Sequence, residues 1–142
     1  MGELTNLEII KEAYAAFGRG DIDAVLSLED RNTELEIAGP KDIPWAGSFR
    51  GHDGARKYFA AIAAEADFDV FEPHTFLAKD DSVVVIGFEK VRSKRTGRFY
   101  QNHWVHTFTL ANGKIVRFRE YCDTATVAAA FRQQAGQQAD AN

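Results

Sequence analysis

The sequence contains little cysteine, no basic block and no long apolar run. Its single cysteine, Cys122, excludes an internal disulfide and a cysteine-cluster metal site. With 17 basic and 21 acidic residues, the net charge is −4, which disfavours wrapping of nucleic acid. No run approaches the about 18 apolar residues of a membrane span, and the first residues lack the pattern of a signal peptide. We therefore expect a cytoplasmic protein with neither nucleic acid nor membrane as partner.

The motifs of several enzyme classes are also missing. The sequence has no GxSxG nucleophile elbow, no phosphate-binding glycine loop and no dinucleotide fingerprint. No two histidines have the spacing of a helical metal site, and His103 and His106 on one expected strand point to opposite faces. We therefore expect neither a metal nor a cofactor.

The length and composition indicate one globular domain. A chain of 142 residues is too short for two domains with good cores, and 45% hydrophobic residues exclude disorder over most of it. The aromatic share of 12% exceeds what a minimal core needs, which hints at a lined pocket. We place the domain at residues 1–134 and a flexible polar tail at 135–142.

Helices are expected mainly in the first half of the chain. Thr5 and Glu8 form the pattern of a capping box, and apolar residues then recur at helical spacing until glycines follow. Asp21 is placed to cap a second helix. The expected helices cover residues 6–17, 22–28, 53–66 and 124–134.

Strands dominate the second half, which makes this an α+β layout. The alternation of apolar and polar residues predicts a meander of long antiparallel strands. The expected strands cover residues 34–38, 68–79, 82–93, 99–110 and 114–122. The segment 40–51, which contains two of the three prolines, is expected to be an ordered loop.

The turn between the last two strands can be read in two ways. A two-residue turn would place Phe108 opposite Arg117, whereas a three-residue turn would place Phe108 opposite Val116 and Trp104 opposite Glu120. Because the three-residue turn joins the apolar stripes of both strands on one face, we expect that register.

In that register His106 and Glu120 lie diagonally on an apolar face that is turned toward the helices. A carboxyl group there is desolvated, which favours its protonated form and suits acid/base work near neutral pH. A purely structural pair between Glu120 and His or Arg is an equal alternative.

Three other polar or aromatic residues have two readings each. Asp123 is placed to cap the final helix and is also a candidate catalytic residue at the pocket mouth. The Tyr14 hydroxyl needs a partner if it is buried, which a ligand or Glu120 can supply, or it lies at the rim. Trp45 is either a lid over a pocket or a plug for the helical layer.

The chain resembles SnoaL-like polyketide cyclases within the nuclear-transport-factor-2-like superfamily. The resemblance spans about residues 5–132 and rests on four segments, Tyr14–Leu26, Ile43–Gly51, Trp104–Leu110 and Gly113–Thr124. It implies a cone of helices on a strongly curved, mixed, mostly antiparallel sheet with a short C-terminal helix. It also implies a deep apolar pocket and a homodimer.

The resemblance implies the site as well. In the polyketide cyclases a strand histidine and a carboxylate further along line the pocket, and the corresponding residues here are His106 and Glu120, with Glu replacing the usual Asp. Ketosteroid isomerases share the fold and have a tyrosine similar in position to Tyr14. The positions of their base and of their proton-donating Asp would fall near Ala38 and Val105. Both residues are missing here, so steroid isomerisation is not expected.

We therefore expect a cofactor-independent enzyme acting on a small apolar carbonyl compound. Glu120 would take a proton alpha to the carbonyl, and His106 or Tyr14 would hydrogen-bond the enolate oxygen. Aldol-type cyclisation, isomerisation and dehydration all fit. The pocket walls would come from Trp45, Phe59, Trp104 and Phe118.

Two other functions stay open, a non-catalytic module that binds an apolar ligand and an interaction domain. For the homodimer we expect sheet-on-sheet contact through the polar outer face. That face carries Thr107, Thr109, Arg117, Arg119 and Tyr121.

Overall fold

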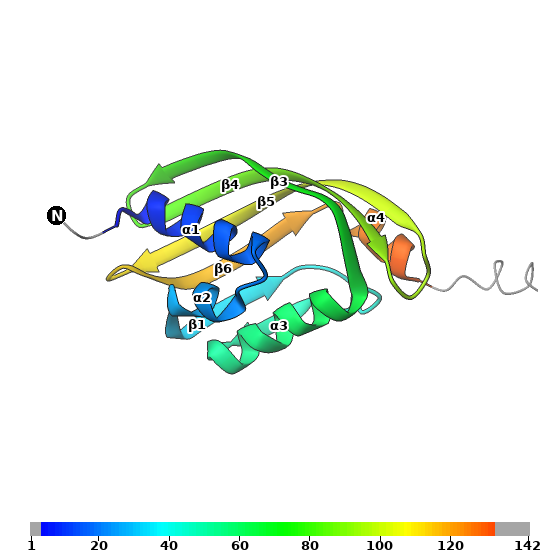
Figure 1. Cartoon of the computed structure of the whole chain (residues 1–142), viewed down its shortest axis with the longest axis horizontal. Coiled ribbons are helices and arrows are strands. Elements are labelled where there is room, and N and C mark those ends of the chain that lie inside the picture. The colour runs from blue at the N-terminus through cyan, green and yellow to red at the C-terminus, as the bar shows by residue number, and fades with distance from the viewer. Residues whose placement is uncertain (1–3, 133–142) are drawn as a thin grey trace, which may run out of the picture.

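The computed structural model describes residues 4–132, so the predicted tail at 135–142 lies outside the described residues. Helices come first and a strand meander follows (Figure 1). The elements are α1 (Asn6–Gly18), α2 (Ile22–Ser27), β1 (Glu29–Ile37), β2 (Gly47–Arg50), α3 (Gly51–Glu65), β3 (Ala66–Lys79), β4 (Ser82–Ser93), β5 (Phe99–Ala111), β6 (Lys114–Cys122) and α4 (Thr124–Phe131).

One curved sheet organises the fold. Its six strands lie in the order β2-β1-β6-β5-β4-β3, and only the β1–β6 pair is parallel. Helices α1, α2 and α3 lie over one face of the sheet, and α4 packs at the end of the meander (Figure 1). The predicted α+β class with a curved, mostly antiparallel sheet is confirmed.

The helix starts follow the capping residues. The Thr5 backbone amide donates to Glu8 Oε1 at 2.8 Å, and the Glu8 amide donates to Thr5 Oγ1 at 3.1 Å, which completes the predicted capping box. Gly20 follows α1 with a φ of +74°, and the Asp21 side chain then accepts from the Ala24 amide at 3.1 Å. The first two helices are therefore fixed by local hydrogen bonds.

Some element boundaries differ from the prediction. Strand β1 starts at Glu29 rather than residue 34, because its first half is polar and shows no apolar alternation. The predicted loop 40–51 contains β2, a four-residue edge strand that pairs with β1 and whose residues are mostly exposed. Helix α3 starts at Gly51 without a side-chain cap, two residues before Asp53.

The predicted three-residue turn between β5 and β6 is wrong. Ala111 pairs with Lys114, so the turn has two residues, and both have positive φ as such hairpin turns require. An irregularity after the Leu110–Ile115 pair then shifts the register, and from there His106 lies directly opposite Glu120. The expected diagonal placement of this pair is therefore corrected.

The shift also explains why the faces were predicted correctly although the turn was not. Phe108 pairs with Phe118, and Trp104 pairs with Cys122 instead of Glu120, so the apolar stripes of both strands still share the inner face. A bulge within β6 corrects the register that the shorter turn would have given. Adjacent apolar residues at 115 and 116 hide this bulge in the sequence.

Candidate functional site

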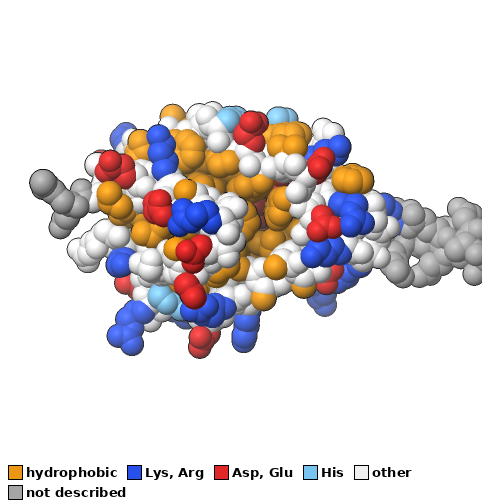
Figure 2. All heavy atoms as spheres, in the orientation of Figure 1, with side chains coloured by type: hydrophobic (Ala, Val, Ile, Leu, Met, Phe, Trp, Pro, Cys, Tyr) orange, Lys and Arg blue, Asp and Glu red, His pale blue; other side chains and the backbone are white. Residues whose placement is uncertain are grey.

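A cavity lies between the inner face of the sheet and the helices. It holds about 920 Å³ of space, including the part open to solvent, and its walls are mainly apolar. Figure 2 shows apolar side chains around a hollow in the middle of the face that carries α1 and α3. Its aromatic walls are Phe17, Trp45, Tyr58, Phe59, Phe68, Phe71, Phe108 and Phe118.

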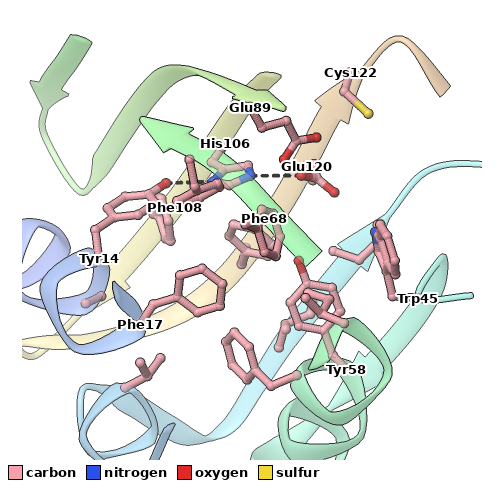
Figure 3. A pocket seen from close by; sticks show the side chains of 18 of the residues that line it. Tyr14, Phe17, Trp45, Tyr58, Phe68, Glu89, His106, Phe108, Glu120 and Cys122 are labelled. Carbon is pink, nitrogen blue, oxygen red and sulfur yellow. Dashed lines mark hydrogen bonds and ion pairs between the residues drawn. The ribbon is translucent and has the colours of Figure 1, made fainter. Parts of the chain in front are cut away.

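A chain of three side chains crosses one wall of the cavity (Figure 3). The Tyr14 hydroxyl lies 2.6 Å from His106 Nδ1, and His106 Nε2 lies 3.0 Å from Glu120 Oε2. The Tyr14 and His106 ring planes are parallel to within 1°. All three residues line the cavity, so the structure brings together the predicted pair and the predicted tyrosine.

The chain has a definite direction when Glu120 is a carboxylate and His106 is a neutral imidazole. His106 Nε2–H then donates to Glu120, which leaves Nδ1 to accept the proton of the Tyr14 hydroxyl. Burial, and secondly the charge of Glu120, raises the pKa of Tyr14, so its hydroxyl stays a neutral donor. Glu120 is thus held by a partner while its second oxygen, Oε1, makes no hydrogen bond with residues 4–132.

Trp104 packs against the His106 imidazole. Its indole is fully buried and stacks on the imidazole with ring centroids 4.0 Å apart. The indole also covers Gly87 on β4, where a Cβ atom would lie 2.1 Å from Trp104 Cζ2. Trp104 is therefore a support rather than the cavity wall that we expected, because the cavity lining does not include it.

Glu89 on β4 is a second cavity carboxyl that sequence reasoning missed. Its side chain is 6% exposed, and burial, followed by the charge of Glu120, raises its pKa to about 8. The signal was present, because Glu89 lies on the buried stripe of β4, between Gly87 and Val91. A carboxylic acid on an apolar stripe is a candidate functional group.

Tyr58 on α3 is a second residue that the prediction treated only as part of a helix. Figure 3 shows its hydroxyl directed into the cavity. Burial raises its pKa well above the usual value, and the charges of Glu120 and Glu89 add to the effect. Only the helical spacing of Tyr58 marked it in the sequence, and this spacing did not distinguish it from the core.

A third carboxyl, Glu29, lines the cavity at the start of β1. Burial raises its pKa to about 7, and its Oε1 is buried with no partner among residues 4–132. Strand pairing places it beside Ile115, whereas Ile37 at the other end of β1 lies beside Glu120. Three carboxyl groups therefore line the cavity, those of Glu29, Glu89 and Glu120, and no Lys or Arg of the described chain does.

Asp123 has the predicted capping role. Its Oδ1 accepts from the Thr126 amide at 3.2 Å and its Oδ2 from the Thr126 hydroxyl at 2.7 Å, and these bonds lower its pKa. Asn102 fixes the Asp123 backbone through two bonds of 3.1 Å. The cavity lining does not include Asp123, so the structure does not bring it to Glu120.

The remaining predicted wall residues lie where we expected them. Trp45, Phe59 and Phe118 all line the cavity. Cys122 also lines it, and burial raises its pKa to about 12, so it is a thiol near neutral pH. Within residues 4–132 no three His, Cys, Asp or Glu side chains form a metal-ligand cluster, and no helix there is long and apolar enough to span a membrane.

The fold is a curved, mostly antiparallel sheet covered by helices, with an apolar cavity that carries titratable side chains. The chain belongs to the SnoaL-like domain family, whose model matches residues 10–118. An uncharacterized protein of Mycobacterium tuberculosis is 27% identical over 126 residues, which cover 88% of this chain and 95% of that protein.

Solved structures agree with this assignment. An NTF2-like protein from Burkholderia xenovorans is 33% identical, with a TM-score of 0.84, over 92% of this chain and 100% of that one. TerC, co-crystallized with polyporic acid, is 27% identical, with a TM-score of 0.81, over 90% of this chain and 98% of its own.

Proposed function

We propose that this protein is a cofactor-independent enzyme that moves a proton on a small, apolar carbonyl compound. The observation that carries the proposal is the hydrogen-bonded chain from Tyr14 through His106 to Glu120 on the wall of an apolar cavity. A carboxylate that is held in place by an imidazole, with one oxygen free, is suited to act as a general base.

In the proposed reaction Glu120 takes the proton alpha to the substrate carbonyl. His106 orients the carboxylate of Glu120. Tyr14 holds the imidazole in the tautomer whose Nε2–H donates to Glu120. The structure suggests for His106 and Tyr14 a different task from the enolate contact that we expected, because they hydrogen-bond one another and Glu120. Return of the proton to another carbon gives isomerisation, and attack of the enolate on a second carbonyl gives cyclisation.

The lining of the cavity favours a neutral substrate. No Lys or Arg of the described residues lines it and Glu120 is the proposed base, so a carboxylate or phosphate would lose its hydration there without gaining a counterion. The aromatic walls supply contact for a flat, apolar body. We therefore propose neutral cyclic ketones as the first compounds to test.

The test is alpha-proton exchange of β-tetralone in deuterated water, followed by proton NMR. We expect the wild-type protein to accelerate exchange, and Glu120→Gln, which keeps the size and the contact with His106, to lose about 100-fold or more. Asp123→Asn is a matched carboxyl-to-amide change, and it retains the helix cap. A similar loss in Asp123→Asn would mean that Asp123 takes part in catalysis. Equal rates for wild type and Glu120→Gln would contradict the proposal.

A second candidate function is ligand binding without chemistry. It is favoured by TerC, a structural relative that was co-crystallized with polyporic acid. Quenching of tryptophan fluorescence by β-tetralone, without any exchange of its alpha protons, would support this function over catalysis. Trp45 lies in the cavity wall and supplies the signal.

We further propose a homodimer through the outer face of the sheet. This face carries the exposed aromatic side chains of Phe99 and Tyr121, and Arg119, two residues before Tyr121 on β6, is paired with Glu36 at 3.1 Å. Such a face suits sheet-on-sheet packing with a second copy. Analytical ultracentrifugation at micromolar concentration should show a dimer, and a monomer there would contradict this arrangement.

A further inference from the structure

The substrate carbonyl oxygen needs hydrogen-bond donors, and the chain that holds Glu120 does not offer them. His106 Nε2 is committed to Glu120 and Nδ1 to Tyr14, so the imidazole has no N–H left for a ligand. With a neutral imidazole, the single proton of the Tyr14 hydroxyl is used as well. Charge that develops on a carbonyl oxygen in an apolar cavity is costly unless other groups donate to it.

Glu89 is one such group. It projects from β4 into the cavity that Glu120 lines from β6, and Figure 3 shows both carboxyl groups at the same end. Burial, and secondly the charge of Glu120, raises the pKa of Glu89. No hydrogen bond to residues 4–132 stabilises the Glu89 carboxyl, and its pKa of about 8 keeps it protonated at neutral pH.

Tyr58 is the other group. It projects from α3, on the side of the cavity opposite the sheet, and it is only 5% exposed. Tyr58 lines the cavity, and its hydroxyl is directed into it (Figure 3). A hydroxyl that faces a cavity is a group with which a ligand can form a hydrogen bond.

We propose that the Glu89 carboxyl and the Tyr58 hydroxyl form a donor pair that binds the carbonyl oxygen of the substrate in the cavity that Glu120 lines. This inference rests on the proposed function and adds two catalytic residues to it. It also narrows the substrate class to neutral ketones with an alpha hydrogen whose oxygen accepts two hydrogen bonds.

The proposed step is balanced in protons and electrons. Glu120 takes the alpha proton, the C–H electron pair becomes the carbon–carbon double bond, and the carbonyl π electrons move to oxygen. Glu89 and Tyr58 keep their protons and donate to this oxygen throughout, so neither residue changes its net charge. Glu120 then returns its proton to carbon, which regenerates the carboxylate and the ketone.

Infrared spectroscopy tests the donor pair without requiring turnover. The probe is β-tetralone with an isotopic label in its carbonyl carbon, bound to the protein, and the readout is the carbonyl stretching frequency. Hydrogen bonds to the oxygen lower this frequency relative to the ketone in an apolar solvent. We expect a clear lowering in the wild-type protein and in Glu120→Gln, because Glu120 contacts the alpha carbon and not the oxygen.

Variants divide the shift between the two donors. Glu89→Leu and Tyr58→Phe remove one donor each and should each lose a large part of the lowering, whereas Glu89→Gln keeps an N–H donor and should retain most of it. Asp123→Asn changes a carboxyl group that does not line the cavity and is the matched control for the shift. In the exchange assay, Glu89→Leu should lose about 100-fold, the loss typical of one missing donor.

The outcomes separate this inference from the proposed function. A carbonyl shift that depends on Glu89 and Tyr58, together with absent proton exchange, would support the donor pair and contradict the proposed catalysis. Exchange that depends on Glu120, with a carbonyl frequency that neither Glu89→Leu nor Tyr58→Phe alters, would overturn the donor pair alone. Failure of the cavity to bind β-tetralone, acetophenone or cyclohexenone at millimolar concentration would overturn the substrate class and the donor pair with it.

Discussion

The charged residues on the two faces of strand β6 lie in different environments, one buried and one exposed to solvent. On the inner face Glu120 is largely buried and pairs with a single imidazole, His106, at 3.0 Å. On the outer face Arg119 pairs with Glu36 at 3.1 Å, with both side chains more than two-fifths exposed. Water screens the charges of the outer pair, so this pair contributes little to the free energy of unfolding. The inner pair is largely buried, so water competes less for its hydrogen bond. A strand with alternating faces can therefore hold a solvated ion pair and a buried polar site one residue apart.

The inner face should make the stability of the protein fall as pH rises. Burial raises the pKa of Glu89 from 4.5 to about 8, so between these values the folded state binds more protons than the unfolded state. The free energy of unfolding therefore decreases through this window, by about 1.4 kcal/mol for each unit of pKa difference. Below pH 4.5 both states are protonated and this contribution no longer changes.

Urea unfolding of wild type and Glu89→Gln from pH 4.5 to 8.5 measures this effect. The variant should lack most of the decrease and be the more stable of the two at pH 8. Glu29→Gln should behave in the same direction but with a window that closes near pH 7, because its carboxyl pKa is raised to about 7. Parallel curves for wild type and Glu89→Gln would mean that the Glu89 carboxyl is ionised in the folded protein at neutral pH.

The contact between Gly87 and Trp104 gives the next largest expected effect. In Gly87→Ala the new Cβ would lie 2.1 Å from the Trp104 indole, which must move and so lose its stacking on His106. We expect a cost of about 3 kcal/mol in the free energy of unfolding, the upper part of the usual range for overpacking. The near-ultraviolet circular dichroism of the indole should change as well.

The matched control is the same substitution at Gly18, in the last turn of α1. Nothing lies within 4 Å of a Cβ there, and alanine favours a helix by about 0.5–1 kcal/mol over glycine. Gly18→Ala should therefore stabilise the protein slightly. If both substitutions destabilised it equally, backbone flexibility rather than the indole contact would be the cause.

The sequence predicted the elements with local signals better than the details of their pairing. The capping box at Thr5, the Asp21 cap and the Asp123 cap each depend on residues three positions apart, and all three are present. The β5–β6 register depends on a turn and a bulge whose effects oppose each other. Only the sum of these two effects determines which residue lies opposite Glu120, and apolar alternation does not report it.

The site shows the same division. His106 and Glu120 were found because each interrupts an apolar stripe in the strands that the prediction compared. Glu89 interrupts a stripe as well, but on β4, whose inner face was not compared with that of β6. Tyr58 gave no such signal, since a tyrosine on an apolar helix face is ordinary core material until the fold shows a cavity beneath it.

Tyr14→Phe should have a moderate effect on the inner face. It removes the 2.6 Å hydrogen bond and leaves His106 Nδ1 without its donor in a buried site. We expect a loss of about 1–2 kcal/mol in the free energy of unfolding. The nitrogen chemical shifts of the His106 ring, which report its tautomer, should change, because the hydroxyl no longer fixes the tautomer. An unchanged stability and unchanged ring shifts would show that the Tyr14 bond does not hold the chain to Glu120.

The smallest effect is expected on the outer face, where Arg119→Ala removes the ion pair with Glu36. Exposed pairs of this kind contribute about 0–1 kcal/mol, and salt screens them further. We expect a change within about 0.5 kcal/mol that shrinks between 50 and 500 mM salt, roughly the behaviour of a screened surface charge. The Tyr14→Phe loss should be insensitive to salt, because the inner chain is buried. If Arg119→Ala cost more than Tyr14→Phe at dimer-forming concentrations and the excess disappeared on dilution, Arg119 would contribute to the dimer contact, since only an intermolecular interaction depends on protein concentration.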